Sequence, residues 1–276
     1  MEELNNTEYH QVYNVEEDET LPERVEVVIC MLLQRGLFIA GFDGSNTLLT
    51  IHYTGLSKNK QVWDLDFFEH LFASEQLLSA KEKVKAVFIS GDKNMIIPEE
   101  LYEEKAAKNW LSHIHFTEPT DQVTAYTIPD TKARYVLAAP VNITELIKIN
   151  FKKVAILPLP LYHFPNSRQQ SIYLQCCLGS GQMSATLHNY GQLLWHRVST
   201  YSSAEDIAFE IKHLCMENNL SPSKLRVVLN AVSTAEYEVI NELTQYYPGL
   251  KAGDGSTIQN RWHPAISLAK QLLACV

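Results

Sequence analysis

The chain has 276 residues and a mass of 31.4 kDa, which predicts one large domain or two modest ones. Hydrophobic residues make up 46% of the chain and charged residues 20%, as in globular proteins that bury a core. Lys and Arg number 23 against 32 Asp and Glu, so the formal net charge is -9. This acidic balance argues against nucleic-acid binding, which requires a basic face.

The acidic residues are concentrated near the start of the chain. Residues 1–20 contain no Lys or Arg, and their seven carboxylates are Glu2, Glu3, Glu8, Glu16, Glu17, Asp18 and Glu19. They supply -7 of the net charge of -9. The pattern is typical of a solvated segment, so we predict an acidic flexible N-terminal tail over residues 1–22. The alternative is a docking arm for a basic partner.

Composition also bears on the cellular compartment. The acidic start does not resemble a secretory leader, which is basic and then apolar. The longest uninterrupted apolar run, Val27–Leu33, is much shorter than the roughly 20 residues that cross a bilayer. The five cysteines include no CxxC pair, which favours free thiols in a reducing compartment. We therefore expect a cytoplasmic protein with no direct membrane insertion.

The first regular pattern is a three-stranded meander. Strands are expected over Arg24–Leu33, Leu37–Phe42 and Thr47–Tyr53. The turns between them are Gln34–Gly36 and a turn that begins with Asp43-Gly44, a dipeptide that favours tight hairpins. A helix near Trp63–Leu78 and a strand over Val84–Ser90 follow. The order of this half is β-β-β-α-β.

The same order occurs again later. Strands are expected over Ser171–Cys177, Met183–His188 and Gln192–Val198, followed by a helix over Ala204–Asn218 and a strand over Leu225–Leu229. Ser203 and Asp206 have the spacing of a capping box at the start of that helix. The turns with Gly36 and Gly181 lie at matching places, 145 positions apart (181 − 36). The chain thus reads as two related halves.

Further elements complete each half. Pro98 predicts the start of a helix that runs to about Ser112. Ser233 and Glu236 have the spacing of a capping box and predict a helix that runs to about Tyr246. Pro264 predicts the start of the last helix. Between the halves we expect a strand over Arg134–Ala139, a helix capped by Asn142 with Glu145, and a second strand over Val154–Leu159. Proline-rich sequence around Phe164–Arg168 marks a boundary. The predicted domains are residues 23–165 and 166–276.

This organisation resembles the actin-like ATPase fold, in which two ribonuclease-H-like domains enclose a nucleotide cleft. The resemblance is carried by YVLAAP (Tyr135–Pro140), NITELIKIN (Asn142–Asn150), VAILPLP (Val154–Pro160) and the second meander. These segments are similar to actin-like pilus-assembly and cell-division proteins. Residues 24–276 also look like an uncharacterised family of gut-bacterial proteins with this fold. The resemblance implies an α/β fold with mixed sheets flanked by helices.

The resemblance also implies where a nucleotide would bind. Active members carry an Asp at the end of the first strand and another before the second phosphate turn, to hold hydrated Mg²⁺ beside backbone N–H groups. Here those stretches are Met31–Gly36 and Gln175–Gly181, and neither contains a carboxylate. The degenerate cleft candidates are Gln34, Arg35, Gly36, Gly179, Ser180, Gly181 and Asn230.

These departures lead to the functional prediction. Metal positioning and charge neutralisation supply most of phosphoryl-transfer catalysis, so we predict a non-catalytic actin-like scaffold that binds another protein and requires no cofactor. The alternative is a nucleotide- or phosphometabolite-binding protein that uses the cleft, with residual ATP binding and Arg35 replacing part of the metal's charge. We predict no catalytic residue and no metal ligand.

Other motifs favour ordinary structural roles. The string Phe42–Thr47 resembles a phosphate loop but fits a hairpin turn, and Gly253–Thr257 fits a surface loop before the last helix. Asp66, Glu69 and His70 have helical spacing that permits a metal site, although acids near a helix start also favour capping.

Overall fold

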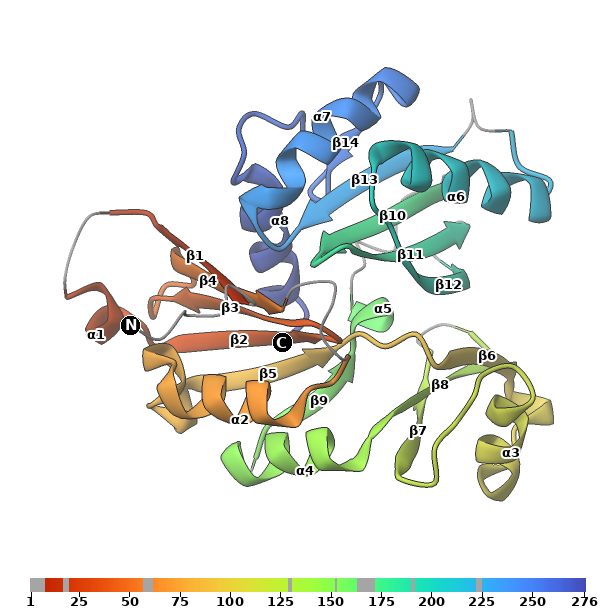
Figure 1. Ribbon diagram of the computed structural model, residues 1–276, viewed down its shortest axis with the longest axis horizontal. Coiled ribbons are helices and arrows are strands. Elements are labelled where there is room, and N and C mark those ends of the chain that lie inside the picture. The colour runs from red at the N-terminus through yellow and green to blue at the C-terminus, as the bar shows by residue number, and fades with distance from the viewer. Residues whose placement is uncertain are drawn as a thin grey trace, which may run out of the picture.

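The computed structural model describes residues 8–16, 20–56, 62–128, 131–151, 153–162, 172–189, 192–221 and 225–276. It contains two larger mixed sheets and one small sheet, with helices against them (Figure 1). The order of the strands agrees with the two repeated halves expected from the sequence. The expected boundary at Phe164–Arg168 lies outside the described residues, so the domain limits stay a prediction.

The first sheet has the strand order β1-β4-β3-β2-β5-β9. Its strands are β1 (Glu8–Asn14), β2 (Val27–Leu33), β3 (Gly36–Phe42), β4 (Leu48–Leu56), β5 (Val84–Ile89) and β9 (Ala155–Pro158). The antiparallel meander β2-β3-β4 is extended by β5 parallel to β2 and by β9 parallel to β5. Helices α2 (Leu65–Ser74) and α4 (Val141–Asn150) bury apolar side chains against one face of the sheet.

The second sheet repeats this order as β12-β11-β10-β13-β14. Its strands are β10 (Ile172–Gly179), β11 (Gln182–Asn189), β12 (Gln192–Thr200), β13 (Arg226–Ala231) and β14 (Lys251–Ala252). Helices α6 (Ala204–Glu217) and α7 (Tyr237–Tyr246) cover one face. The predicted capping box of Ser203 and Asp206 is present at the start of α6. The two β-β-β-α-β halves inferred from the sequence therefore share one topology.

The last helix, α8 (His263–Leu273), lies between the two halves. Its buried residues Ala265, Leu268, Ala269 and Leu272 join a core with side chains of the first sheet and with Cys177 and Val232 of the second half. Figure 1 shows α8 between β13 and the ends of β3 and β4. Because one helix buries apolar surface of both halves, it couples their stability.

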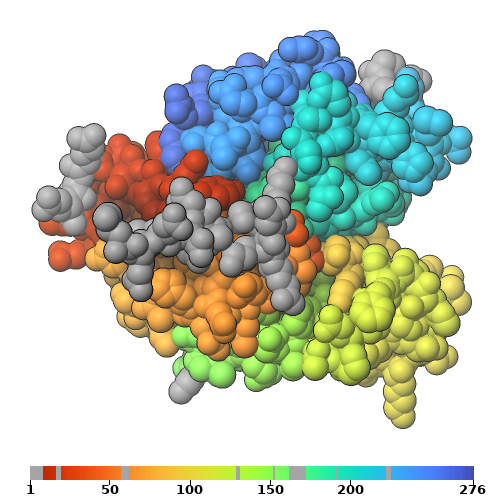
Figure 2. All heavy atoms as spheres, in the orientation of Figure 1, coloured from red at the N-terminus to blue at the C-terminus, as the bar shows by residue number. Residues whose placement is uncertain are grey.

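A small sheet, β6-β8-β7, was not expected as a unit. It consists of β6 (Asn94–Pro98), β7 (Asp121–Thr127) and β8 (Ala133–Pro140). The helix predicted from Pro98 to Ser112 is wrong over most of its length: two 3-10 turns precede a short helix, α3 (Ala107–Ser112). Pro98 instead ends β6. In Figure 2 the surface is hollowed between this yellow-green part and the cyan second half.

The predicted tail is wrong for residues 8–14, which form β1 antiparallel to β4. Alternate side chains of β1 face the second half: the Tyr9 hydroxyl lies 3.3 Å from Ser180 Oγ, Gln11 Oε1 accepts from Thr234, and the Tyr13 ring packs on Trp262. Strand alternation puts these three residues on one side. The acidic composition concealed a strand because all of the carboxylates of residues 1–20 except Glu8, its first residue, lie outside it.

Smaller differences concern element ends. Strand β2 begins at Val27 rather than Arg24, because Leu21–Arg24 form one turn of helix, α1. Helix α4 begins at Val141, so Asn142 lies inside it rather than at its cap. A further one-turn helix, α5 (Leu159–Tyr162), follows β9. Among the described helices, none is both long and apolar enough to cross a membrane.

Shortening one buried side chain of α8 tests whether this helix couples the stability of the two halves. Leu268 is fully buried between the halves, so Leu268→Ala should lower the free energy of unfolding by about 2–5 kcal/mol because it removes packed methyl groups and leaves a cavity. Urea unfolding of the full chain measures the change. The exposed neighbour Lys270 provides the control, and Lys270→Ala should change stability by less than about 0.5 kcal/mol. Equal midpoints for the two variants would contradict a core role for α8.

Candidate functional site

The two hairpin turns expected to line the cleft contact each other directly. Ser180 Oγ donates a hydrogen bond to the backbone oxygen of Arg35 over 3.1 Å. The two residues are 145 positions apart, which is the offset of the internal repeat. Equivalent turns of the two halves therefore meet face to face.

Side chains extend this contact on both sides. Gln182 Nε2 donates to Gln34 Oε1 over 2.6 Å, and Gln34 Nε2 donates to Asp92 Oδ1 over 2.6 Å. On the other side, the Tyr53 hydroxyl is hydrogen-bonded to Ser180 Oγ. Since the Ser180 proton is directed at the Arg35 oxygen, Tyr53 is the donor to Ser180. We call Gln34, Arg35, Tyr53, Ser180 and Gln182 the turn-to-turn contact.

Glu236 occupies a position behind the second turn that the sequence did not reveal. We predicted it as a helix-capping partner of Ser233, but its Oε1 accepts from the backbone N–H of Ser180 over 3.2 Å and its Oε2 from Ser233 Oγ over 2.5 Å. Burial raises the pKa of this carboxyl to about 7, although both hydrogen bonds act in the opposite direction. Its burial and this pKa are signals that only the tertiary structure provides.

The glycines of the predicted site serve close packing. A Cβ on Gly36 would lie 2.6 Å from the Tyr53 hydroxyl oxygen. A Cβ on Gly179 would lie 3.0 Å from Leu33 Cδ1, across the junction of the halves. Ser180 and Gly181 adopt positive φ angles of 50° and 67°, which form the tight turn. These positions let the two turns approach one another.

Asn230 is the one predicted site residue that lies elsewhere. Its Nδ2 donates to Gln271 Oε1 of α8 over 2.9 Å, and Gln175 Nε2 donates to the same oxygen over 3.2 Å. Gly253 packs so closely on the Asn230 amide that it has no space for a side chain. The structure thus brings Gln34, Arg35, Gly36, Gly179, Ser180 and Gly181 together, while Asn230 faces α8.

A hollow of about 250 Å³ opens beside the turn-to-turn contact. Its lining includes Tyr9, Leu56, Ser180, Tyr201 and Glu236. Burial, and then the charge of Glu236, raise the pKa of Tyr9 and of Tyr201. The hollow is therefore bordered by neutral phenols and one acidic group, a set that does not attract phosphate.

The loop Gly253–Thr257 is held by its own side chains. Asp254 Oδ1 accepts from the backbone N–H and the Oγ of Ser256, and Ser256 Oγ lies 3.0 Å from His263 Nε2. His263 Nδ1 accepts from the backbone N–H of Gln259, so its proton is on Nε2 and points to Ser256. The His263 imidazole therefore cannot accept the Ser256 proton in this arrangement. The hydrogen bonds among Asp254, Ser256 and His263 order the loop.

The remaining sequence motifs also have structural roles. Asp43 Oδ1 accepts from Ser45 and Thr47 and closes the hairpin between β3 and β4. Asp66, Glu69 and His70 are exposed on α2. Within the described ranges, no three His, Cys, Asp or Glu side chains gather as a metal site would require.

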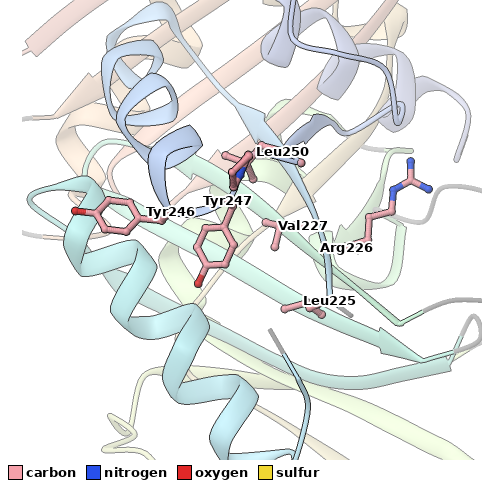
Figure 3. A pocket seen from close by; sticks show the side chains of 8 residues that line it. Leu225, Arg226, Val227, Tyr246, Tyr247 and Leu250 are labelled. Atoms are coloured by element: carbon pink, nitrogen blue, oxygen red, sulfur yellow. The ribbon is translucent and has the colours of Figure 1, made fainter. Parts of the chain in front are cut away.

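A separate pocket of about 330 Å³ lies in the second half, next to β14 (Figure 3). The Tyr246 hydroxyl donates to Glu205 Oε1 and the Tyr247 hydroxyl to the backbone oxygen of Ala208. Both tyrosines thus attach the end of α7 to α6. The pocket's lining contains none of the predicted site residues.

Sequence comparison places the chain in a family. The sequence profile of the family described as "Protein of unknown function (DUF3822)" matches residues 28–250. The chain belongs to this DUF3822 family. No curated protein matches it by sequence. The match covers both meanders, the small sheet and the turn-to-turn contact of this DUF3822 member.

Two solved structures share the fold of this DUF3822 chain. A Bacteroides thetaiotaomicron protein with an actin-like ATPase fold and unknown function superposes with a TM-score of 0.71 at 13% identity, covering 95% of this chain and 100% of its own. A PilM–PilN type IV pilus biogenesis complex gives a TM-score of 0.57 at 12% identity, covering 91% and 98%. Because the identities are so low, these two similarities establish the actin-like ATPase fold alone.

The buried Glu236 predicts a pH dependence of stability. The folded chain retains the Glu236 proton to about pH 7, whereas an unperturbed Glu loses it near 4.5. The folded state therefore binds more protons in that window, and this group's contribution to stability falls as pH rises through it, by up to about 3 kcal/mol. In Glu236→Gln, which mimics the protonated acid, the fall should be absent.

Urea unfolding of the parent and of Glu236→Gln between about pH 4 and about pH 8, a range that includes both ends of the predicted change, measures this difference. Glu242→Gln at an exposed site of α7 is the matched control and should follow the parent. Parallel profiles for the parent and Glu236→Gln would show that the folded chain does not hold the proton.

Proposed function

We propose that this protein is a non-catalytic actin-like scaffold that acts by binding another protein. The observation that carries the proposal is the hydrogen bond from Ser180 Oγ to the Arg35 oxygen, beside the pair Gln34–Gln182. Protein atoms thus fill the space between the turns where the fold's nucleotide phosphates would be held. The contact between the turns joins the two halves into one body with a fixed outer surface.

The electrostatics around the second turn support the same proposal. A phosphate site uses free backbone N–H groups and positive charge. Here the N–H of Ser180 is bonded to Glu236, and an ionised Glu236 would repel a phosphate. The strand ends beside the two turns present Leu33 and Leu178 rather than carboxylates.

Protein binding has a precedent within this fold. One of the similar solved structures is a complex of PilM with PilN, so a protein of this fold can act by holding a protein partner. We extend this mode of action to the present chain as part of the proposal. The five cysteines, all free and four of them buried, support a reducing bacterial cytoplasm as its location.

One observation favours the alternative of a nucleotide or phosphometabolite site. The buried Nε of Arg35 has no hydrogen-bond partner among the described residues, and a guanidinium at the first turn is a suitable donor to phosphate. A ligand there would have to separate Ser180 from the Arg35 oxygen. The alternative therefore predicts that the halves open when a phosphate ligand binds.

Thermal unfolding distinguishes the two functions. With about 1 mM Mg-ATP we expect no change in Tm, because the turn-to-turn contact fills the site. Ligand at about 100 times its Kd would stabilise by about 2.7 kcal/mol, which corresponds to roughly 5–10 °C for a chain of this size. A shift of that size would contradict the closed scaffold and favour the alternative.

Partner binding is tested with the full chain. Affinity capture from the cells that produce it should recover a protein that, once purified, forms a stoichiometric complex with the chain in size-exclusion chromatography with light scattering. A captured protein that fails to form this complex is non-specific. Failure to obtain any stoichiometric complex would overturn the scaffold proposal.

A further inference from the structure

A groove of about 870 Å³ lies at the edge of the first half, remote in sequence from the turn-to-turn contact. It is bordered by the 3-10 turn Lys81–Lys83, the start of β5 and the last residues of α4. Val84 and Phe151, each 3% exposed, contribute to its apolar lining. Ile149 also lines it and is 68% exposed. The groove therefore offers an uncovered apolar surface connected to the core.

The strand register explains why the groove is open. In the parallel pair of β5 and β9, the first partners are Ala86 and Ala155. Val84 and Lys85 therefore extend beyond the start of β9, which is the edge strand of the sheet. The groove lies at this end of the sheet edge, where Lys153 and Val154 line it.

Positive charge surrounds this apolar surface. Lys81, Lys85 and Lys153 line the groove, against the single carboxylate of Glu82. The Lys81 ammonium donates to Asn150 Oδ1 over 3.1 Å, and that of Lys85 to the backbone oxygen of Glu82 over 3.3 Å. Both acceptors are neutral, so the two lysines retain their charge for a ligand. This local excess contrasts with the net charge of -9 for the whole chain.

We propose that this lysine groove (Lys81, Lys85 and Lys153 around Ile149 and Phe151) binds an acidic segment of a protein partner. Carboxylates of the segment would pair with the lysines, and a large apolar side chain would cover Ile149. The inference rests on the proposed scaffold function and names the docking surface and the chemistry of the partner. Charge complementarity steers such association, while the buried apolar contact provides most of the affinity.

The combination of charge and apolar lining favours a peptide over other anions. Free phosphate would gain nothing from Ile149, Val154 or Phe151. An anionic membrane would contact a broad, convex basic surface more readily than a concave groove with lysines at its border. A peptide can supply both carboxylates and an apolar anchor at the spacing of the groove.

The test uses two fluorescein-labelled peptides and the full-length protein. The probe is Glu-Glu-Glu-Leu-Phe-Glu-Glu-Glu, and its partner peptide has Ala-Ala in place of Leu-Phe. Fluorescence anisotropy should show saturable binding of the probe, weaker binding of the Ala-Ala peptide, and a loss of affinity when NaCl is raised from about 50 mM to about 300 mM, because salt screens exposed charges.

Charge reversal locates the site. Lys85→Glu with Lys153→Glu should weaken probe binding by about tenfold or more, because two attractive charges become repulsive. Lys105→Glu with Lys212→Glu is the matched control: both are exposed lysines outside the groove, and the net charge changes equally. Affinity should stay within about twofold of the parent in the control. Thermal unfolding verifies that both variants are folded.

Several results would overturn the lysine groove. These are the absence of saturable probe binding, equal binding by the two double variants, and equal binding of the two peptides. Lysine-dependent binding to phosphatidylserine vesicles without peptide binding would replace the proposal with a membrane site. If the probe fails while a captured partner still forms a stoichiometric complex, the groove is wrong and the scaffold function stands. If no partner forms a complex while the probe binds as expected, the groove binds acidic peptides but the scaffold function is wrong.

Discussion

The hydrogen bond between Ser180 and the Arg35 backbone oxygen is the contact around which the two halves are arranged. It joins equivalent positions of an internal repeat, so the two hairpins approach as related surfaces and form a closed junction. Gln34, Tyr53 and Gln182 add bonds around it. Buried polar groups require partners, and these side chains satisfy one another across the junction. In the proposed function, these same bonds fill the space between the two turns.

Two other elements contact both halves. Strand β1 crosses from the first half to the second through Tyr9, Gln11 and Tyr13. Helix α8 buries apolar side chains against both halves. Behind the second turn, the buried Glu236 accepts from the N–H of Ser180. Closure thus converts a two-lobed architecture into a body whose stability is shared. A body of this kind is suited to presenting fixed outer surfaces, of which the lysine groove combines an apolar lining with positive charge.

Local patterns predicted the central strands well and the peripheral ones poorly. Strands β2, β3 and β10 are almost entirely buried, so their largely apolar sequences identify them. Strand β7 is mostly half-buried, and its mixed sequence carries no clear period. Strand β1 is mostly polar on its outer side and has acidic flanks, which resemble a solvated segment. Both peripheral strands are defined by their partners, β8 and β4.

The sequence alone determined the repeated β-β-β-α-β order, the turns with Gly36 and Gly181, and the lack of carboxylates in Met31–Gly36 and Gln175–Gly181. These are local properties of residue type and spacing. Only the tertiary structure decided that the turns bond to each other, that Glu236 is buried behind one of them, and that Asn230 faces α8. It also assembled the lysine groove from residues of the segments 81–85, 149–151 and 153–154. Contacts between residues far apart in the chain depend on how the halves dock, and no local pattern encodes that geometry.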